Sequence, residues 1–430
     1  MKKILIFYCL TFLLLLQACS QQQKIERGIV YNHLTLKNDT SLSYAIYVPV
    51  NTVRNDSLIF LFFDPHGNGE LPVNMYKNLA DKYGITLIGN NNSANGIDFN
   101  TISSNFSALL NELKSTYKID EKNIALWGFS GGAKAAIYNA GLNNNIAYCI
   151  YGGSVMNTQN KNIELLGFNG KQDMNYTDLL TFASQQQNNQ KHFQIAFNGK
   201  HAWPDTTTAE DAFRWLLLKK MQKIEIPANK IFAAKCFAYY KKKTDKLIQS
   251  NQLTDAFQTC NKSIHFLQTL TATNYFTKQK DSISGKPLFK KQVQELQATF
   301  VKESQLKTQY QTNFFSKDTL YWKNEIEQLW SASKTDPTGI YNRLLGFLSL
   351  AGYSYASQAF QANDIKALEQ ILFIYQHSDP ANPEQAYMRA KLYALKNEKE
   401  KAKTALDESI KLGIDKNRIA NDILLKTYNH

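Results

Sequence analysis

Short apolar runs alternate with helical patterns from residue 28 to about residue 223, and this alternation most strongly limits the folds open to the chain. Residues 58–63 are apolar throughout, as in a strand that is covered on both faces of its sheet. Residues 102–117 place their apolar side chains along one helical stripe. Because strands that alternate with helices build largely parallel sheets, the pattern predicts a doubly wound α/β unit at 28–223.

The predicted elements of this unit can be placed by residue range. Strands are expected at 41–50, 58–63, 85–88, 124–127, 146–151, 163–167 and 193–197, and helices at 102–117, 131–140 and 208–220.

The alternation stops near Pro227, and residues 224–430 show one helical pattern after another. A chain of 430 residues exceeds one ordinary domain of about 100–200 residues. We therefore predict a second, all-helical domain at 224–430. This half holds 29 of the 49 Lys and Arg residues, so most of the net charge of +13 belongs to it. The lysines at 241–243 predict a solvated helix face, and we expect no nucleic-acid partner.

A faint internal repeat marks the helical half. Asn363 and Asn397 stand 34 residues apart in similar surroundings, which is the period of tetratricopeptide repeats. The resemblance to these repeats covers about residues 340–415 and implies helical hairpins that could bind a protein partner. A non-repetitive helical bundle stays open as the alternative, because the repeat is clear only twice.

The first nineteen residues have the layout of a secretory signal: two lysines, an apolar run and a small residue before Cys19. The segment that ends at Cys19 resembles the bacterial lipobox, in which the cysteine is acylated and begins the mature protein. That resemblance implies a signal peptide at 1–19, a polar tether at 20–27 and a lipid anchor in the cell envelope. We expect an outer-membrane anchor that faces the periplasm.

Cysteine usage gives little support to metal or redox chemistry. The five cysteines are scattered and none forms a C-x-x-C pair, so we expect no metal and no cofactor. Whether Cys236 and Cys260 form a disulfide stays open.

Ser130 stands in a G-x-S-x-G pattern between a predicted strand and a predicted helix. Glycines on either side permit the sharp strand-to-helix turn that exposes a serine at the carboxyl end of a sheet. A serine hydroxyl needs a neighbouring base, which is itself oriented by a carboxylate. The loop after strand 163–167 carries Asp173 and the loop after strand 193–197 carries His201. Since parallel strands end at one edge, the three side chains are expected to converge.

These segments resemble the secreted esterase and poly-hydroxybutyrate-depolymerase-like branch of the α/β-hydrolase superfamily, over about residues 40–223. The resemblance implies Ser130 as nucleophile, His201 as general base and acid, and Asp173 as orienting acid, with Asp178 as the substitute. It also implies an oxyanion hole formed by the N–H of Gly131 and an N–H near Gly67 or Asn68.

The sequence thus favours a lipid-anchored serine hydrolase that cleaves a small ester or a polysaccharide ester through an acyl-enzyme. A serine peptidase of the same fold is one alternative. A non-catalytic interaction lipoprotein that uses its helical repeats is the other. The substrate itself cannot be derived from these residues, because one fold supports many chemistries.

Replacing Cys19 tests the anchor. Cys19→Ala should release the protein from the membrane fraction without loss of ester hydrolysis, because acyl chains anchor the protein and do not shape the site. Cell fractionation with an activity assay measures both. A variant that stays with the membrane would show that the apolar run anchors the chain by itself.

Overall fold

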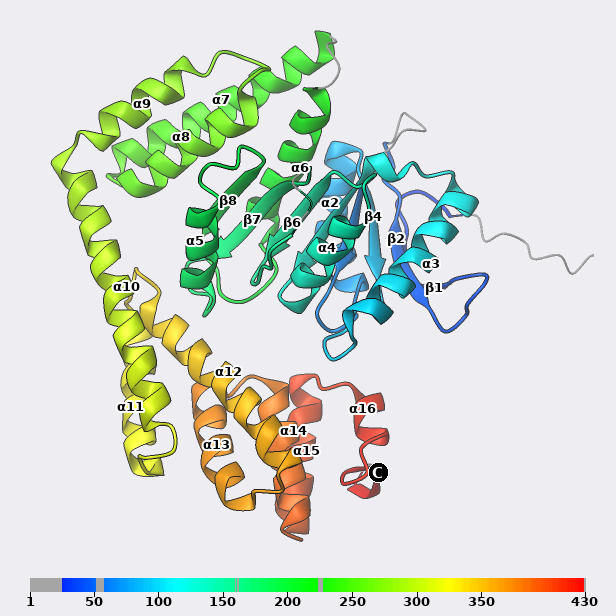
Figure 1. The fold of residues 1–430 in the computed structure, drawn as a ribbon, viewed down its shortest axis with the longest axis vertical. Helices are drawn as coiled ribbons and strands as arrows, with labels where there is room; N and C mark the ends of the chain where they lie inside the picture. The colour runs from blue at the N-terminus through cyan, green and yellow to red at the C-terminus, as the bar shows by residue number, and fades with distance from the viewer. Residues whose placement is uncertain (1–24, 52–57, 159, 161, 223–226, 429–430) are drawn as a thin grey trace, which may run out of the picture.

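The structure, a computed structural model, describes residues 25–51, 58–158, 160, 162–222 and 227–428. The predicted signal, Cys19 and most of the tether lie outside the described residues. Figure 1 shows an α/β unit with helices packed above it, beside it and below it.

The centre of the α/β unit is an eight-stranded sheet in the order β1-β2-β4-β3-β5-β6-β7-β8. Strand β2 pairs with β1 and β4 in antiparallel fashion, whereas all pairs from β4 to β8 are parallel. This mostly parallel sheet with helices on both faces is the doubly wound α/β unit that the sequence predicts. The strands are β1 Val30–Thr35, β2 Ser43–Tyr47, β3 Ile59–Phe63, β4 Thr86–Asn90, β5 Ile124–Phe129, β6 Tyr148–Gly152, β7 Glu164–Gly170 and β8 His192–Phe197.

Alternate side chains of each strand enter two separate cores. Phe60 and Phe62 of β3 point to the face covered by α2 and α6, and Trp127 of β5 joins them there. Leu61 and Phe63 point to the opposite face, which α3, α4 and α5 cover. The helices are α2 Glu70–Tyr83, α3 Phe99–Tyr117, α4 Gly131–Leu142, α5 Tyr176–Gln185 and α6 Thr206–Met221, with a 3₁₀ turn at Glu121–Asn123.

Strand β1 and helices α2 and α5 were not among the elements predicted from the sequence. In β1 the side chains are mostly half-buried or exposed, so its apolar pattern is weak. Helix α2 carries Pro72 in its first turn, a position where proline is tolerated although it usually interrupts a helical pattern. The seven predicted strands and three predicted helices are all present, with shifted ends.

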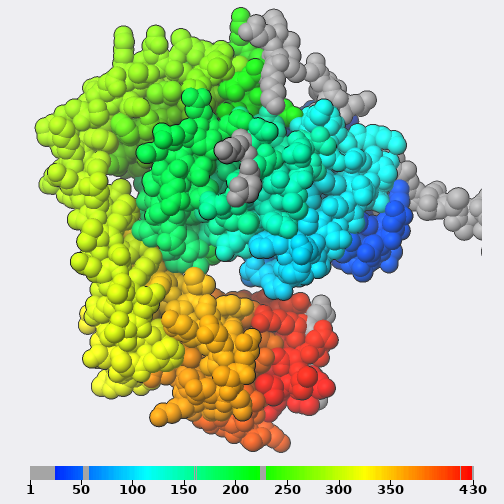
Figure 2. Space-filling model, viewed as in Figure 1, coloured from blue at the N-terminus to red at the C-terminus, as the bar shows by residue number. Residues whose placement is uncertain are grey.

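The second half of the described chain is helical. Its helices are α7 Pro227–Gln249, α8 Leu253–Leu267, α9 Asn274–Ser284, α10 Pro287–Asn313, α11 Thr319–Ser333, α12 Ile340–Gln361, α13 Ile365–Ser378, α14 Pro383–Leu395, α15 Lys399–Leu412 and α16 Lys416–Ala420, followed by a 3₁₀ turn at Lys426–Tyr428. Figure 2 shows them wrapped around the α/β unit, with α10 and α11 in yellow along one side.

Helices α7, α8 and α9 share a core with the sheet. Buried side chains from these helices, among them Tyr240, Cys260 and Phe276, belong to the same apolar cluster as Phe60 and Trp127. Helices α10 to α15 contribute to a separate cluster. The predicted division at 223/224 is therefore a change of secondary-structure class, while the core continues across it.

A buried charge pair joins the two halves. Asp211 of α6 lies 2.5 Å from the Nζ of Lys262 on α8, and both side chains are about 5% exposed. Burial works to raise the pKa of Asp211, but the surrounding cations, Lys262 first, hold that pKa below its ordinary value. Tyr240 of α7 donates to the same carboxylate. Arg214 of α6 also lies 3.2 Å from the Asp211 carboxylate, so two cations and the Tyr240 hydroxyl share one buried acid. These contacts fix α7 and α8 on α6.

Three helical hairpins turn in the same way. Asn251, Asn363 and Asn397 all have positive φ, between 53° and 60°, which asparagine adopts more easily than most residues. The next residue in each turn donates its N–H to a carbonyl five residues back: Gln252 to Leu247, Asp364 to Ala359 and Glu398 to Tyr393. The hairpins are present, whereas their tetratricopeptide character stays a prediction.

In the part of the chain that the structure describes, no helix is long and apolar enough to cross a membrane. Cys149, Cys236 and Cys260 are buried free thiols, which answers the question about the Cys236–Cys260 pair in favour of unpaired residues.

The structure predicts acid-sensitive stability where the His192 side chain of β8 contacts Tyr151 of β6 and Phe182 of α5. Burial lowers the pKa of His192 to about 4, whereas an unfolded histidine titrates near about 6.5. The unfolded chain binds this proton first as pH falls, so the His192 contribution to the free energy of unfolding should fall between about pH 6.5 and pH 4, by about 1.4 kcal/mol per pH unit. Burial also lowers the pKa of His265, to about 3, which adds a fall of the same sign. Thermal unfolding of the wild type and of His192→Gln measures the effect.

The slope of the unfolding free energy against pH should be shallower in His192→Gln than in the wild type. It should be unchanged in His33→Gln, which alters an exposed histidine. Equal slopes in all three proteins would show that His192 is not held neutral.

Candidate active site

Ser130 lies at the turn between β5 and α4 with a strained backbone. Its φ of 52° and ψ of −123° are rare for a residue with a side chain. Two glycines make the turn possible: a Cβ on Gly128 would lie 2.1 Å from the Gly132 carbonyl oxygen, and one on Gly132 would lie 2.0 Å from that of Phe63. The N–H of Ser130 donates to the Gly152 carbonyl at 2.8 Å, which fixes the turn to β6. The sequence expectation for this segment is confirmed at the level of backbone geometry.

The structure brings Ser130, His201 and Asp173 together. The Oγ of Ser130 is 3.0 Å from Nε2 of His201. Nδ1 of the same ring is 2.9 Å from each carboxylate oxygen of Asp173. Asp173 is 1% exposed and the His201 side chain 24% exposed, so the carboxylate is shielded from water while the imidazole faces a cavity.

Two contacts orient the histidine. The ring of Phe129 lies 4.8 Å from the His201 ring, centroid to centroid. Two residues further, Trp203 donates from Nε1 to the buried carboxylate of Asp64 at 2.9 Å, which ties the histidine loop to the end of β3. Trp127 and Trp203 are both buried packing residues.

The loop that carries Asp173 follows β7 and is bonded to the histidine loop. Lys171 and Gln172 donate their N–H groups to the carbonyls of Phe197 and Gly199, at 2.8 and 2.9 Å. The N–H of Asn175 donates to the Asp173 carboxylate at 2.9 Å. Asp178, the substitute acid, lies one turn into α5 and is exposed at the cavity.

The two loop residues predicted for the oxyanion hole are not placed at the site. The N–H of Gly67 donates to the Asp64 carbonyl at 3.1 Å and that of Asn68 to the Asp64 carboxylate at 3.4 Å. Neither residue lines the cavity at Ser130, whereas Gly131 does. The loop folds back on Asp64, an arrangement that the sequence did not reveal, and a role of Gly67 or Asn68 in the oxyanion hole stays a prediction.

Asn95 occupies the place next to Gly131 instead. Its carboxamide lies so close that a Cβ on Gly131 would be 1.8 Å from Oδ1. The side chain belongs to the polar loop that follows β4. No feature of the sequence distinguished Asn95 from the other asparagines of that loop.

The cavity at Ser130 has a volume of about 520 Å³. Besides Ser130, Gly131 and His201 it is lined by side chains from the α/β unit and by Leu350 of α12, namely Asn95, Lys134, Ser154, Val155, Met174, Asn175, Asp178 and Leu179. Leu350 is 43% exposed and comes from the helical half. Sequence reasoning missed it, because nothing in a helical pattern shows which distant loop the helix approaches.

A second cavity of about 740 Å³ adjoins the first. It lies between α5 on one side and α10 and α12 on the other, and it shares Met174, Asn175, Asp178 and Leu350 with the cavity at Ser130. Among the described residues no group of three or more His, Cys, Asp or Glu side chains could hold a metal ion.

No protein-family model matches the sequence, and no curated protein is detectably similar to it. Solved structures match part of this chain at low sequence identity. A carboxylesterase from Mesorhizobium loti is 15% identical over 43% of this chain and 99% of its own, with a TM-score of 0.34. Est1E from Butyrivibrio proteoclasticus is 11% identical over 44% of this chain and 99% of its own, with a TM-score of 0.36.

An acetyl xylan esterase from Aspergillus awamori is 16% identical over 34% of this chain and 73% of its own, with a TM-score of 0.27. The activities in these names belong to those proteins.

Proposed function

We propose that the protein is a serine hydrolase that cleaves a carboxylic ester or a carbohydrate ester through an acyl-enzyme. The observation that carries this proposal is the continuous set of contacts from Ser130 Oγ to His201 and from His201 to the buried Asp173 carboxylate. A serine aligned in this way becomes nucleophilic at neutral pH, which an isolated hydroxyl does not.

In the proposed reaction the Oγ of Ser130 attacks the ester carbonyl while His201 Nε2 accepts the hydroxyl proton. The same nitrogen then returns the proton to the alcohol that leaves. Water enters next, His201 removes its proton, and attack on the acyl-enzyme releases the acid and restores Ser130. Asp173 keeps the ring oriented and stabilises the imidazolium without taking the proton.

The oxyanion would be held at the start of α4. The N–H of Gly131 lies at this helix N-terminus, where backbone N–H groups are free of helical partners and the helix dipole favours negative charge. We propose the Asn95 carboxamide as the second donor, because it lies against Gly131 in the same cavity. A side-chain amide can serve this role as well as a backbone N–H.

The position of the protein in the cell is part of the proposal. The lipobox-like segment at Cys19 supports export and anchoring in the envelope, at the outer membrane facing the periplasm, and the hairpins of α12 to α15 support a tetratricopeptide-like region with a protein partner. Ester hydrolysis is favoured over peptide cleavage on the resemblance of the segments around Ser130, Asp173 and His201.

Single substitutions in the three residues test the proposal. Ser130→Ala and His201→Ala should each lower kcat for a small ester by roughly 10⁶-fold, and Asp173→Asn by about 10⁴-fold, because the residues act as one unit. Steady-state kinetics measures the losses, and thermal unfolding checks that each variant is folded.

Asp178→Asn is the matched control for the acid. It should lower kcat for the small ester by less than about tenfold, because the Asp178 carboxylate does not contact His201. If Asp178→Asn were the more damaging change, the acid would be misassigned. Full activity in the Ser130, His201 and Asp173 variants would overturn the enzyme proposal.

Leu350→Trp tests whether α12 forms a wall of the substrate site. A larger ring at the junction of the two cavities should obstruct bulky esters more than an acetate ester. The ratio of kcat/KM between the short and the bulky ester should therefore rise by about tenfold or more. Tyr353→Trp changes an exposed residue of the same helix and should leave the ratio as in the wild type. An unchanged ratio in Leu350→Trp would place the bound substrate away from α12.

A further inference from the structure

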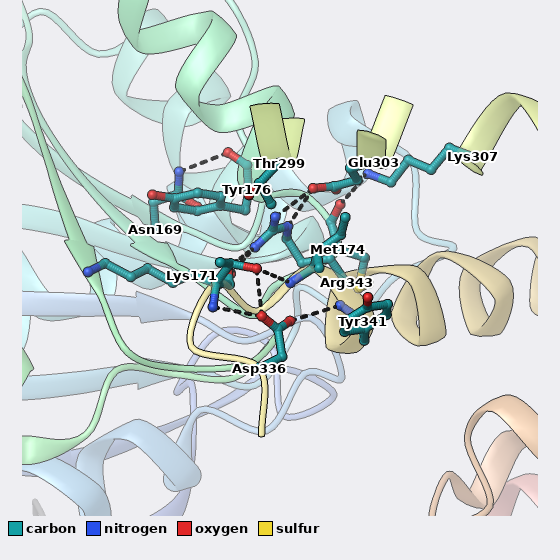
Figure 3. A network of polar contacts seen from close by, with 12 residues as sticks. Asn169, Lys171, Met174, Tyr176, Thr299, Glu303, Lys307, Asp336, Tyr341 and Arg343 are labelled. Carbon is teal, nitrogen blue, oxygen red and sulfur yellow. Dashed lines mark hydrogen bonds and ion pairs between the residues drawn. The ribbon is translucent and has the colours of Figure 1, made fainter. Parts of the chain in front are cut away.

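Cations from the helical half donate to the loop that carries Asp173. The Nη1 of Arg343 on α12 donates to the Lys171 carbonyl at 2.6 Å. The Nζ of Lys307 on α10 donates to the Met174 carbonyl at 3.2 Å. Figure 3 shows both side chains reaching the loop from α10 and α12. The two carbonyls stand on either side of Gln172 and Asp173, so the contacts hold the segment at both ends.

A buried carboxylate holds these cations in place. Glu303 of α10 is 1% exposed and Arg343 is fully buried. Glu303 Oε2 is 2.6 Å from Nη2 and 2.7 Å from Nε of Arg343, and Oε1 is 2.8 Å from Nζ of Lys307. Arginine presents its donors in a rigid planar fork, so a fixed guanidinium also fixes the direction in which Nη1 points.

The backbone next to Arg343 is shaped for close approach to the same loop. Gly339, with φ of 76°, lies where a Cβ would be 2.5 Å from the Lys171 carbonyl oxygen. Gly346 lies one turn after Arg343 on α12, where a Cβ would be 3.1 Å from Cβ of Met174. The guanidinium of Arg343 also lies 5.2 Å from the ring of Tyr176, the first residue of α5.

Stability alone does not account for this arrangement. Buried ion pairs contribute little net stability compared with apolar side chains of similar volume. Here the pair is placed where its remaining donors reach the backbone around Asp173, whose carboxylate must stay within hydrogen-bond distance of His201. A displacement of about 1 Å in such a group can lower a rate by roughly 10²-fold.

We propose that Arg343, Lys307 and Glu303 are positioning residues that hold the Asp173 loop in its working geometry, so that the helical half is required for full activity of the triad. The inference rests on the proposed function of Ser130, His201 and Asp173. It assigns the helical half a role at the site that is separate from the binding of a partner protein.

The test uses the full-length chain and a paired replacement. Glu303→Leu with Arg343→Met removes both buried charges together, which avoids leaving one of them unpaired. The matched control is Arg389→Met with Glu408→Leu, since this pair joins α14 to α15 at 2.6 Å. Arg343→Lys keeps the charge without the fork, and Lys307→Met removes the donor to Met174 together with the ion pair to Glu303.

Three measurements are made on each protein: steady-state kinetics on a small ester, the rate of phosphonylation by a fluorophosphonate, and hydrogen exchange of the segment 170–176. The paired Glu303/Arg343 variant should lose about 10- to 100-fold in kcat and in phosphonylation rate with little change in KM. Hydrogen exchange of the backbone amides in 170–176 should become faster in this variant than in the wild type. Arg343→Lys should recover part of the loss, and the Arg389/Glu408 control should behave as the wild type.

Equal kcat and phosphonylation rates in the paired Glu303/Arg343 variant and the wild type would overturn the positioning role while leaving the proposed function in place. An equal loss in the Arg389/Glu408 control would also overturn it, because the effect would then be one of general stability. If the wild type were neither active nor phosphonylated, the proposed function would fail and the positioning role with it.

Discussion

The register between two loops is the constraint on which the candidate site depends. Lys171 and Gln172 bond through their backbone N–H groups to Phe197 and Gly199, so the loops after β7 and β8 leave the sheet as a joined pair. Asp173 and His201 follow within two residues of these bonds. A slip of one residue in either loop would move a side chain of the triad by about 3.3 Å, more than a hydrogen bond tolerates. The strained turn after β5 places Ser130 beside His201 of this pair of loops.

Much of this arrangement could be predicted because it follows from local rules. An apolar strand that ends in a glycine-flanked serine predicts an exposed turn, and parallel strands bring the loops after β7 and β8 to the same edge. Those rules place Ser130, Asp173 and His201 without knowledge of distant contacts. The resemblance gave Gly67 and Asn68 for the oxyanion hole, but the fold of the Asp64–Asn68 loop depends on Asp64 accepting bonds from its own loop and from Trp203, which local rules do not show.

The contribution of the helical half could not be predicted from the sequence. Arg343, Lys307 and Leu350 look like ordinary residues of amphipathic helices, and only the tertiary structure brings them to β7 and α5. The shared apolar core of α7 to α9 with the sheet has the same origin, since Tyr240 and Cys260 occur in unremarkable helical patterns. The sequence therefore predicts the secondary structure well, but it does not predict the contacts between the α/β unit and the helical half.

Ser130 is proposed as the single activated hydroxyl in a site that both halves build. The residue that reacts with a fluorophosphonate can be located by digestion of the labelled full-length protein and mass spectrometry of its peptides. We expect one phosphonyl group per chain, on Ser130, and none on protein in which His201 is replaced by alanine. A protein that takes up no label, or takes it up at another residue, would contradict this proposal.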